Sequence, residues 1–587
     1  MQSTAIQPAQ VAKTSISYEV AMPQPTSHLF EVTLQIQGWQ AAVLDLKMPV
    51  WTPGSYLVRE YAKQIQDFAA ANSREQRLSS WKLSKNHWQI DTQNTAEITV
   101  RYRVFANELS VRTNHLDATH GYFNGAALFC FIPEFEQQPI SVKIVPPKPD
   151  WRVTTPLPAV GSNTFRADDF DTLVDSPFEI GTQQLYNFEA GGKPHQWAVW
   201  GQGNANMPQI IADTRSIIEV EAELFGDLPY ERYLFLLHLS GSGFGGLEHK
   251  DSCSLNYPRF GFRAKDKYRR FMQLVAHEFF HLWNVKRIRP KPLEKFDYER
   301  ESYISSLWFC EGTTSYYDTI IPLRAGIYDR QTCLENLSKD ITRLQTTPGR
   351  KIQPVSESGF DAWIKLYRRD ANSDNSQISY YLKGELVSLL LDLLIRARHR
   401  NHRSLDDVMR QMWQRFGRAE IGFTAAELQA TIESVAETAL SDFFSRYIDG
   451  TEELPFNQYL EPFGLRLKSV CEDEPVPYLG IKVVSDGGKE TIKAVVAESP
   501  AAVAGLDAGD ELLAVDGLRV TAEQLNERLK DYQAGDRLQV TVFHQDQLLT
   551  LAVELAEPQP SRYEIVPIDN PTDTQKQNLS GWLGSES

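Results

Sequence analysis

Cysteine is scarce in this 587-residue chain, and its few cysteines follow no recognisable pairing pattern. There are five, an odd number, and no two form a CxxC pair. This argues against a disulfide framework and against a zinc site made of thiolates, and it favours ordinary thiols in a reducing compartment. The five are Cys130, Cys253, Cys310, Cys333 and Cys471.

Long apolar runs and an excess of positive charge are also missing. No stretch approaches the about 18–20 apolar residues that a membrane span requires. The first residues, MQSTAIQPAQVAKTSISYEV, contain neither the basic start nor the apolar centre of a signal peptide. With 60 basic and 76 acidic residues, the net charge of −16 argues against nucleic acid or an anionic membrane as the main partner. We therefore expect a cytoplasmic protein that binds neither nucleic acid nor membrane.

The chain has instead the length and composition of a multidomain globular protein. Single cores stop growing at about 250–300 residues, so two to four domains are expected. Hydrophobic residues make up 42% of the chain and charged residues 23%, which is ordinary for such proteins. Short alternating runs such as SISYEVAM and AEITVRYRVF predict an antiparallel, sandwich-like β domain over residues 1–188. No titratable cluster in it has catalytic spacing, so we expect a scaffold or substrate-shaping role.

From residue 189 to residue 455 the pattern is mostly helical. The strand pattern RYLFLLHLS (232–240) leads into GSGFGGLEHK, and helical runs such as KYRRFMQLVAHEFFHLWNV follow. Residues 456–475 are expected to form a polar linker, 476–557 a small α/β domain, and 558–587 a polar tail with a short apolar end. The predicted fold class is therefore multidomain α+β.

The segment HEFFH places His277 and His281 four residues apart, with Glu278 directly after the first histidine. In an α-helix these histidines would differ by about 40° in direction and about 6 Å in height, so they could share one metal ion. Glu278, rotated by about 100°, could reach a metal-bound water as a general base. The alternative is a hydrogen-bonded histidine pair in a buried helix, because the motif occurs by chance in about one to two percent of chains this long.

Catalytic zinc normally has a third protein ligand. Glu311, in WFCEGTTSYYD, is the best candidate, because a carboxylate among Trp308 and Phe309 would be costly to bury without a cation. Asp318, seven residues further on and on the same helix face, is a secondary candidate for orienting a ligand. The alternatives for Asp318 are a helix cap and a solvent-facing carboxylate.

Together these segments resemble the gluzincin metallopeptidases, whose zinc ligands are His, His and Glu. HEFFHLWNVKRIRP (277–290), WFCEGTTSYY (308–317) and VWTPGSYLVREYA (50–62) resemble the glycyl aminopeptidase family in particular. Members of that family have an N-terminal β domain, a thermolysin-like (gluzincin) catalytic domain and a C-terminal PDZ domain. The resemblance covers nearly the whole chain. It implies a zinc-dependent aminopeptidase with one zinc ion per chain and a preference for small first residues such as Gly or Ala.

The segment GGLEH (245–249) resembles the G-x-M-E-N segment of the aminopeptidase N branch. The resemblance implies that Glu248 binds the substrate's α-amine and that Gly245 and Gly246 lie along the bound peptide. The alternative is an ordinary glycine-rich turn with an exposed acid.

The segment YYLKGE (380–385) resembles the Y-x-K-G helix of the same branch. The resemblance implies that the hydroxyl of Tyr381, or of Tyr380 in its place, stabilises the oxyanion formed during hydrolysis. The alternative is a pair of aromatic core residues on an amphipathic helix.

The segment YLGIKV (478–483) resembles the carboxylate-binding loop of PDZ domains, and SPAAVAGLDAGDELLAVDGLRV (499–520) contains their characteristic turns. The resemblance implies that a peptide's C-terminus binds by β-augmentation at this loop. The loop residues are Tyr478, Leu479, Gly480 and Ile481. The alternative is a PDZ fold that serves only as a packing module.

The expected substrates are thus peptides with an unblocked N-terminus. Two rival functions remain open at this point. One is a zinc endopeptidase with PDZ-guided substrate capture, in which Glu248 is structural. The other is a non-catalytic PDZ adaptor built on a vestigial peptidase fold.

Overall fold

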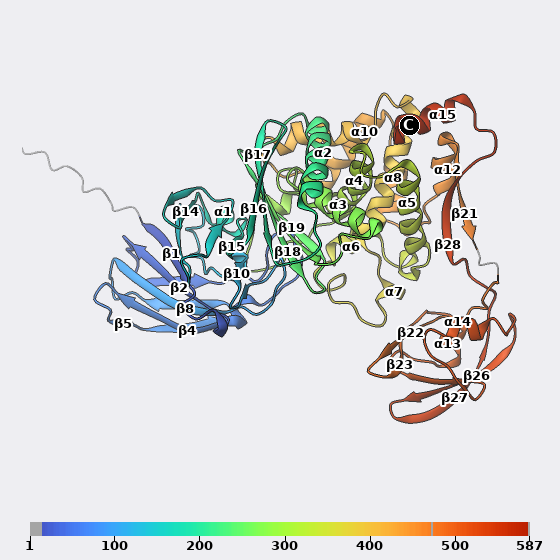
Figure 1. Ribbon diagram of the computed structural model, residues 1–587, viewed down its shortest axis with the longest axis horizontal. Coiled ribbons are helices and arrows are strands. Elements are labelled where there is room, and N and C mark those ends of the chain that lie inside the picture. Colours follow the sequence, from blue (N-terminus) through green and yellow to red (C-terminus); the bar gives the residue numbers. More distant parts are fainter. Residues whose placement is uncertain (1–13, 471–473, 585–587) are drawn as a thin grey trace, which may run out of the picture. The chain divides into compact units, whose positions relative to one another are not determined.

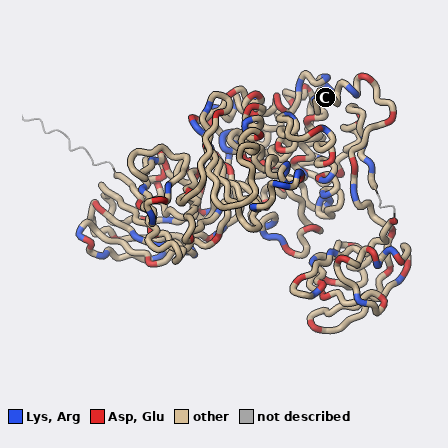
Figure 2. Tube along the Cα trace, in the orientation of Figure 1, with Lys and Arg blue, Asp and Glu red and all other residues tan. Residues whose placement is uncertain are grey.

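The computed structural model describes residues 14–470 and 474–584, which form two compact units. The first unit consists of residues 14–222, 226–282 and 295–302, and the second of 223–225, 283–294 and the described residues from 303 onward. Strands dominate the start of the chain and helices its middle, which confirms the predicted α+β fold class (Figure 1). Acidic and basic residues are interspersed along the described trace of both units (Figure 2).

The cysteines and the helices of the described residues bear on two expectations from the composition, concerning disulfides and membrane spans. The described cysteines Cys130, Cys253, Cys310 and Cys333 are buried thiols that form no disulfide. Cys471 and residues 1–13 of the N-terminal segment judged to lack a signal peptide lie outside the described residues. No described helix is both long enough and apolar enough to cross a membrane.

Three sheets surround one core at the start of the first unit. Alternation of side chains along β2 buries Phe30, Val32, Leu34 and Ile36 on one face, as a half-buried strand requires. The eight-stranded sheet has the order β13 (Ala159–Gly161), β14 (Thr164–Ala167), β11 (Ile140–Val145), β1 (Ser15–Ala21), β2 (Leu29–Gln37), β8 (Glu97–Phe105), β4 (Ile65–Asn72), β5 (Arg77–Leu78). The smaller sheets are β12 (Arg152–Thr154), β15 (Phe178–Gly181), β10 (His120–Phe123), β9 (His115–Leu116), and β3 (Val43–Lys47), β7 (His87–Asp91), β6 (Ser80–Ser84).

A five-stranded sheet and two helices follow in the same unit. The apolar run of β18 is buried along its whole length, as expected for a strand with parallel neighbours on both sides. The sheet order is β16 (Gln184–Ala190), β17 (Lys193–Trp200), β18 (Tyr233–Ser240), β20 (Ser252–Pro258), β19 (Gly245–Glu248), with α2 (Met207–Phe225) between β17 and β18 and α3 (Lys265–Phe280) after β20. The short strand β19 therefore forms one edge of the sheet.

Helix α3 packs on this sheet through its aromatic stripe. The Phe271 ring lies 6.3 Å from that of Trp197, and the Phe279 ring 5.9 Å from that of Phe235. The sequence pattern predicted a helix continuing beyond His281, but α3 ends at Phe280. The chain tightens there because the Leu282 amide donates to the Phe279 carbonyl oxygen at 3.1 Å, an i to i−3 bond.

Helices form the main part of the second unit. The long helix α8 is buried over most of its length, which explains its nearly continuous apolar sequence. The principal helices are η5 (Trp308–Thr313), α4 (Thr314–Arg324), α5 (Arg330–Gln345), α8 (Tyr380–His399), α9 (Leu405–Met412) and α10 (Ala425–Ala436). Helices η5 and α8 approach most closely at two glycines. A Cβ on Gly384 would lie 2.5 Å from the Trp308 carbonyl oxygen and 3.0 Å from the Gly312 Cα.

The segments expected to be a linker and a tail contain regular structure that the sequence analysis did not predict. Strand β21 (Leu465–Val470) pairs antiparallel with β28 (Arg562–Pro567), and helices α12 (Phe456–Leu460) and α15 (Asp573–Leu583) flank them. Trp582 of α15 donates from Nε1 to the Tyr316 hydroxyl at 3.1 Å. The alternation in LRLKSV and RYEIVP is too short to be recognised without the partner strand. Residues 471–473 and 585–587 of these segments lie outside the described part.

Between β21 and β28 the chain forms a small sheet domain with its own core. Leu512, Val515, Leu538, Val540 and Val542 contribute to this core from the central strands. Its strands have the order β22 (Ile481–Asp486), β23 (Lys489–Val495), β24 (Glu511–Val515), β26 (Arg537–His544), β27 (Gln547–Glu554), with β25 (Leu518–Arg519) beside β24, and its helices are α13 (Pro500–Ala504) and α14 (Leu525–Leu529). The predicted domain boundaries at residues 188, 455 and 557 stay predictions.

Replacing Gly384 by alanine is expected to lower the free energy of unfolding by about 1–3 kcal/mol, because the added methyl group would overlap the Trp308 carbonyl. The better helix propensity of alanine, about 1 kcal/mol, offsets only part of this cost. The matched control is Gly241→Ala, since a Cβ there would meet nothing within 4 Å. Denaturant unfolding followed by circular dichroism measures both variants. Equal stability of the two would contradict the close glycine contact.

Candidate active site

Three of the predicted site residues gather in the first unit, where β19 passes the end of α3. Glu248 is the last residue of β19, and Glu278 and His281 lie at the end of α3. One potential ligand atom from each lies within 4.8 Å of those of the other two. Their exposed fractions are only 4%, 4% and 1%. Two carboxylates buried so close together repel each other, so the cluster favours a cation.

The two histidines of HEFFH converge as the helical spacing predicted. The Nε2 atoms of His277 and His281 are 3.0 Å apart, and their rings are nearly perpendicular. Nitrogen ligands of a tetrahedral zinc ion, bound at about 2.0–2.1 Å, are separated by a similar distance of about 3.3 Å. The imidazole pair therefore fits a shared metal ion.

Glu278 lies against the edge strand and has an unsatisfied carboxylate oxygen. A Cβ on Gly246 would lie 2.1 Å from Glu278 Oε1, so only glycine leaves room for this carboxylate. Glu278 Oε2 has no hydrogen-bond partner among the described residues. Burial raises the pKa of Glu278; the charges of His277 and His281 oppose this rise, and the Glu248 carboxylate adds to it. A carboxyl group with a raised pKa is suited to taking up and releasing a proton.

The N-terminal β region forms a wall of this cluster, which the sequence analysis did not predict. A Cβ on Gly54 would lie 2.4 Å from Glu248 Oε1, and Gly54 has a φ of +84° that favours glycine. Arg112 donates from Nη2 to the Gly246 carbonyl oxygen at 3.0 Å. Glu248 Oε1 has no hydrogen-bond partner among the described residues. A turn glycine and a single arginine have no spacing that would have identified them from the sequence.

Glu221 of α2 is a second residue that the sequence analysis missed. Its side chain is fully buried, and neither carboxylate oxygen has a hydrogen-bond partner among the described residues. Burial raises its pKa well above the ordinary value, and the nearby charge of His277 opposes that rise. Glu221 is therefore a buried carboxylate that interacts with His277 through charge, without a hydrogen bond among the described residues.

In the second unit, Glu311 lies buried in the π-helical turn η5. Single π-turns are frequent at functional sites. The Asn284 side-chain amide holds this turn by donating to the Phe309 and Cys310 carbonyl oxygens at 3.0 and 3.3 Å. Asn284 directly follows the HEFFHLW segment, but nothing in the sequence assigned it this contact.

Tyr381 is the second residue of helix α8, in the same unit as Glu311. Burial raises the pKa of Tyr381 well above its ordinary value, and the Glu311 carboxylate adds to the rise, so the phenol keeps its proton. Its hydroxyl is 3.3 Å from that of Tyr367. Tyr380 is fully buried and stacks on Tyr381, which is only half-buried. Tyr381 is therefore the more exposed residue of the two.

Asp318 lies on α4, where the Thr319 hydroxyl is 3.5 Å from its Oδ1. Its charge also raises the pKa of Tyr328, after the larger effect of burial. The role of Asp318 in orienting a metal ligand stays a prediction.

The predicted peptide-binding loop of the small C-terminal domain lines a cavity of about 490 Å³, together with residues that include Lys482, Val495 and Leu525. Gly480 has a φ of +89°, and a Cβ there would lie 2.2 Å from the Ser499 Cβ. Leu479 belongs to the domain core. The loop is thus fixed at the edge of the cavity; its residues are Tyr478, Leu479, Gly480 and Ile481.

Comparison with known proteins assigns families to three parts of the chain. The Peptidase M61 N-terminal domain matches residues 17–182, the M61 glycyl aminopeptidase domain residues 270–387, and the PDZ domain residues 477–555. A comparison with curated proteins gives no match.

Two solved structures are similar to this chain to different extents. An aminopeptidase N family protein from Idiomarina loihiensis is 32% identical, covers 97% of this chain and 100% of its own, and superposes with a TM-score of 0.91. The M1 zinc metallopeptidase from Deinococcus radiodurans is 12% identical, with coverage of 76% and 96% and a TM-score of 0.47. The first similarity extends over both chains, and the M61 domains account for the N-terminal and catalytic regions. The chain therefore belongs to the M61 glycyl aminopeptidase family, has a C-terminal PDZ domain, and is a metalloaminopeptidase.

Proposed function

We propose that this enzyme is a zinc-dependent aminopeptidase that binds the α-amine of a peptide at Glu248 and hydrolyses the first peptide bond. The observation that carries the proposal is the pair of buried carboxylates, Glu248 and Glu278. Each has an oxygen without a hydrogen-bond partner among the described residues. Burying a carboxylate without a partner is costly, so each oxygen favours a specific ligand. A peptide ammonium suits Glu248, which lies on the edge strand.

His277, His281 and Glu311 are the proposed ligands of one zinc ion per chain. Two imidazoles and one carboxylate, with a fourth position left open, are a common ligand set for catalytic zinc. The 3.0 Å separation of the histidine nitrogens supports the pairing of the first two ligands. All three residues belong to the matched M61 segment, residues 270–387. When bound, zinc supplies a Lewis acid that polarises a carbonyl group and lowers the pKa of water.

The remaining steps belong to side chains of this protein. Glu248 accepts hydrogen bonds from the substrate ammonium and so selects unblocked N-termini. Glu278 Oε2 takes a proton from the attacking water and passes it to the departing amine nitrogen. The Tyr381 hydroxyl donates to the developing oxyanion, a contact typically worth about 3 kcal/mol.

The edge strand β19 can position the peptide backbone. Gly245 and Gly246 begin this strand, which pairs with β20 on one side only. An extended peptide can add to such an edge through main-chain hydrogen bonds. Part of the proposal is a preference for small first residues, glycine or alanine; the description of the matched family names glycine.

A peptide C-terminus is the proposed ligand of the PDZ loop Tyr478–Leu479–Gly480–Ile481. The support is the cavity of about 490 Å³ that the loop lines beside β22 and α14. Loop amides would hold the carboxylate and the strand edge would hold the peptide.

The substitution Glu248→Gln is expected to reduce kcat/KM for a Gly-Xaa peptide roughly 30- to 4000-fold. The reason is that loss of a buried charge partner costs about 2–5 kcal/mol. Wild type should not cleave the N-acetylated peptide, and chelation should abolish activity until zinc is restored. The matched control is Glu219→Gln, because Glu219 is exposed on α2. Equal cleavage of both peptides would identify an endopeptidase, and metal binding without any cleavage would favour a binding protein.

The substitution Gly246→Ala tests the position of Glu278. The added Cβ would collide with Glu278 Oε1, so the carboxylate must move. Displacement of a catalytic group by about 1 Å can cost roughly 100-fold in rate, and we expect that loss in kcat with metal content unchanged. Gly241→Ala is again the control. Full activity of Gly246→Ala would argue against Glu278 as the base in its present position.

Metal content and activity should separate in a further pair of variants. Glu311→Gln is expected to bind one zinc equivalent fewer than wild type, because a ligand is lost. Glu278→Gln should keep the wild-type zinc content while losing about 10²–10⁴-fold in kcat, the usual contribution of a general base. Elemental analysis and steady-state kinetics on the same samples measure both. Full zinc content in Glu311→Gln would show that another residue is the third ligand.

A further inference from the structure

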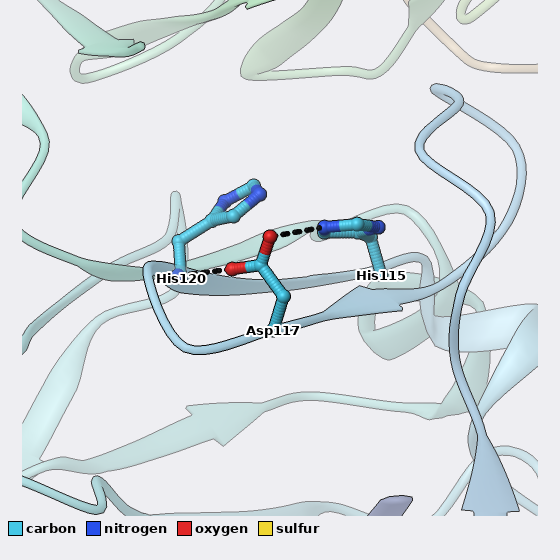
Figure 3. A group of neighbouring side chains, drawn as sticks. All are labelled: His115, Asp117 and His120. Carbon is cyan, nitrogen blue, oxygen red and sulfur yellow. Dashed lines mark hydrogen bonds and ion pairs between the residues drawn. The ribbon is translucent and has the colours of Figure 1, made fainter. Parts of the chain in front are cut away.

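A second group of potential metal ligands lies in the N-terminal β region of the first unit. The segment HLDATH forms the hairpin of β9 and β10, and it holds His115, Asp117 and His120. One potential ligand atom from each lies within 4.8 Å of those of the other two. Figure 3 shows the Asp117 carboxylate between the two imidazole rings. The sequence analysis expected no titratable cluster with catalytic spacing in this region; the hairpin brings these three residues together although their spacing is not helical.

The turn fixes the orientation of Asp117. Its Oδ1 accepts hydrogen bonds from the Thr119 amide at 2.7 Å and from the His120 amide at 3.1 Å. The other oxygen, Oδ2, lies 3.3 Å from His115 Nε2 (Figure 3). The turn thus uses one carboxylate oxygen and leaves the second facing the histidines.

The tautomer of His120 follows from its partner Glu179. His120 Nδ1 is 2.8 Å from Glu179 Oε1, so Nδ1 carries the proton and Nε2 presents a lone pair. The His120 side chain is fully buried, and Nε2 has no hydrogen-bond partner among the described residues. A carboxylate that holds the far nitrogen of a histidine is the usual arrangement behind a metal-binding imidazole.

The charge states of the group also suit a metal ion. Burial lowers the pKa of His115, which keeps it neutral. Burial alone would raise the pKa of Asp117, but hydrogen bonds from Thr119, His120 and His115 outweigh it and lower the pKa to about 2. A carboxylate with so low a pKa is ionised at neutral pH, the form in which it binds a metal ion.

We propose that His115, Asp117 and His120 bind a second divalent transition-metal ion, for which zinc fits best. Imidazole and carboxylate ligands suit zinc and its neighbours in the first row. Ligand atoms around tetrahedral zinc are about 3.3–3.5 Å apart, so small side-chain rotations would close the group on the ion. The side chains of His115 and Asp117 are 13% and 33% exposed, which gives the ion a route from solvent and an open coordination position.

The ion would stabilise the packing of the hairpin within the first unit. The His120 ring stacks on Trp200 of β17 with centroids 3.6 Å apart. Glu179 of β15 also holds His238 of β18, with Oε2 and Nε2 2.9 Å apart. The ligands thus connect directly to the strands of the five-stranded sheet. This inference does not depend on the proposed peptidase site.

The test is a titration of metal-free, tag-free protein with zinc alone, read by calorimetry and by elemental analysis. Wild type should bind two equivalents and Asp117→Asn one. The asparagine keeps the Oδ1 acceptor of the turn, so the hairpin should remain folded. His115→Gln, at a partly exposed position, should lose the same equivalent. Glu179→Gln should weaken that equivalent by about 10- to 100-fold.

Two further variants separate this site from the peptidase site. The His281→Ala variant should lose only the zinc equivalent of the peptidase site. Co²⁺ added to this variant should give a visible ligand-field spectrum. The double variant His281→Ala/His115→Gln should give no such spectrum. His87→Gln is the control, because the His87 imidazole pairs with the single carboxylate of Asp45 at 2.8 Å. Retention of two equivalents in both Asp117→Asn and His115→Gln would overturn the inference. The inference would also be overturned if the wild type bound only one zinc equivalent and the His281→Ala variant bound none. If the peptidase site instead binds no zinc, His281→Ala would match wild type while Asp117→Asn still lost metal.

Discussion

Mutual repulsion between Glu248 and Glu278 is the constraint on which the site depends. The two carboxylates are buried together beside His281, and burial penalises the charged form of each. Glycine at positions 54 and 246 is what permits this crowding, because any larger residue would occupy the space of the carboxylates. A bound cation relieves such repulsion, and so does a proton, since burial and the Glu248 charge raise the pKa of Glu278. The arrangement therefore suits the ammonium and the metal ion proposed as its ligands.

The part of the site that could be predicted from the sequence is the part that depends on local geometry. His277, Glu278 and His281 share one helix turn, so their spacing alone predicted that both rings face one way. Glu248 and Tyr381 were predicted only by resemblance, because nothing local distinguishes them from a turn acid and a core tyrosine. Glu221, Gly54 and Arg112 were missed because their contacts join elements far apart in the chain. The strands β21 and β28 were missed for the same reason, since each is recognisable only beside the other.

Histidine–carboxylate pairs recur in the first unit at different depths. Glu179 is buried between two histidines, and burial alone would raise its pKa, but His120 and His238 outweigh this and lower it to about 2. Glu221 has no hydrogen-bonded partner among the described residues, and burial raises its pKa well above the ordinary value. Burial favours the neutral form of a carboxyl group, and hydrogen-bond donors that point at it favour the charged form. The pKa therefore depends on both effects. Glu179 fixes the orientation of both histidine rings through its hydrogen bonds, whereas Glu221 has no such partner among the described residues.

The pairing of β21 with β28 makes the PDZ domain an insertion within one structural element, not an appendage at the chain's end. Both connections to the domain leave from adjacent strands of the same two-stranded sheet. A chain cut short at residue 475 would therefore lose more than a peptide-binding module. It would also leave β21 without its partner and remove the Trp582 hydrogen bond to Tyr316 in the helical region. Replacing one PDZ domain by another would leave the β21–β28 pair intact in this topology, whereas loss of everything after β21 would not.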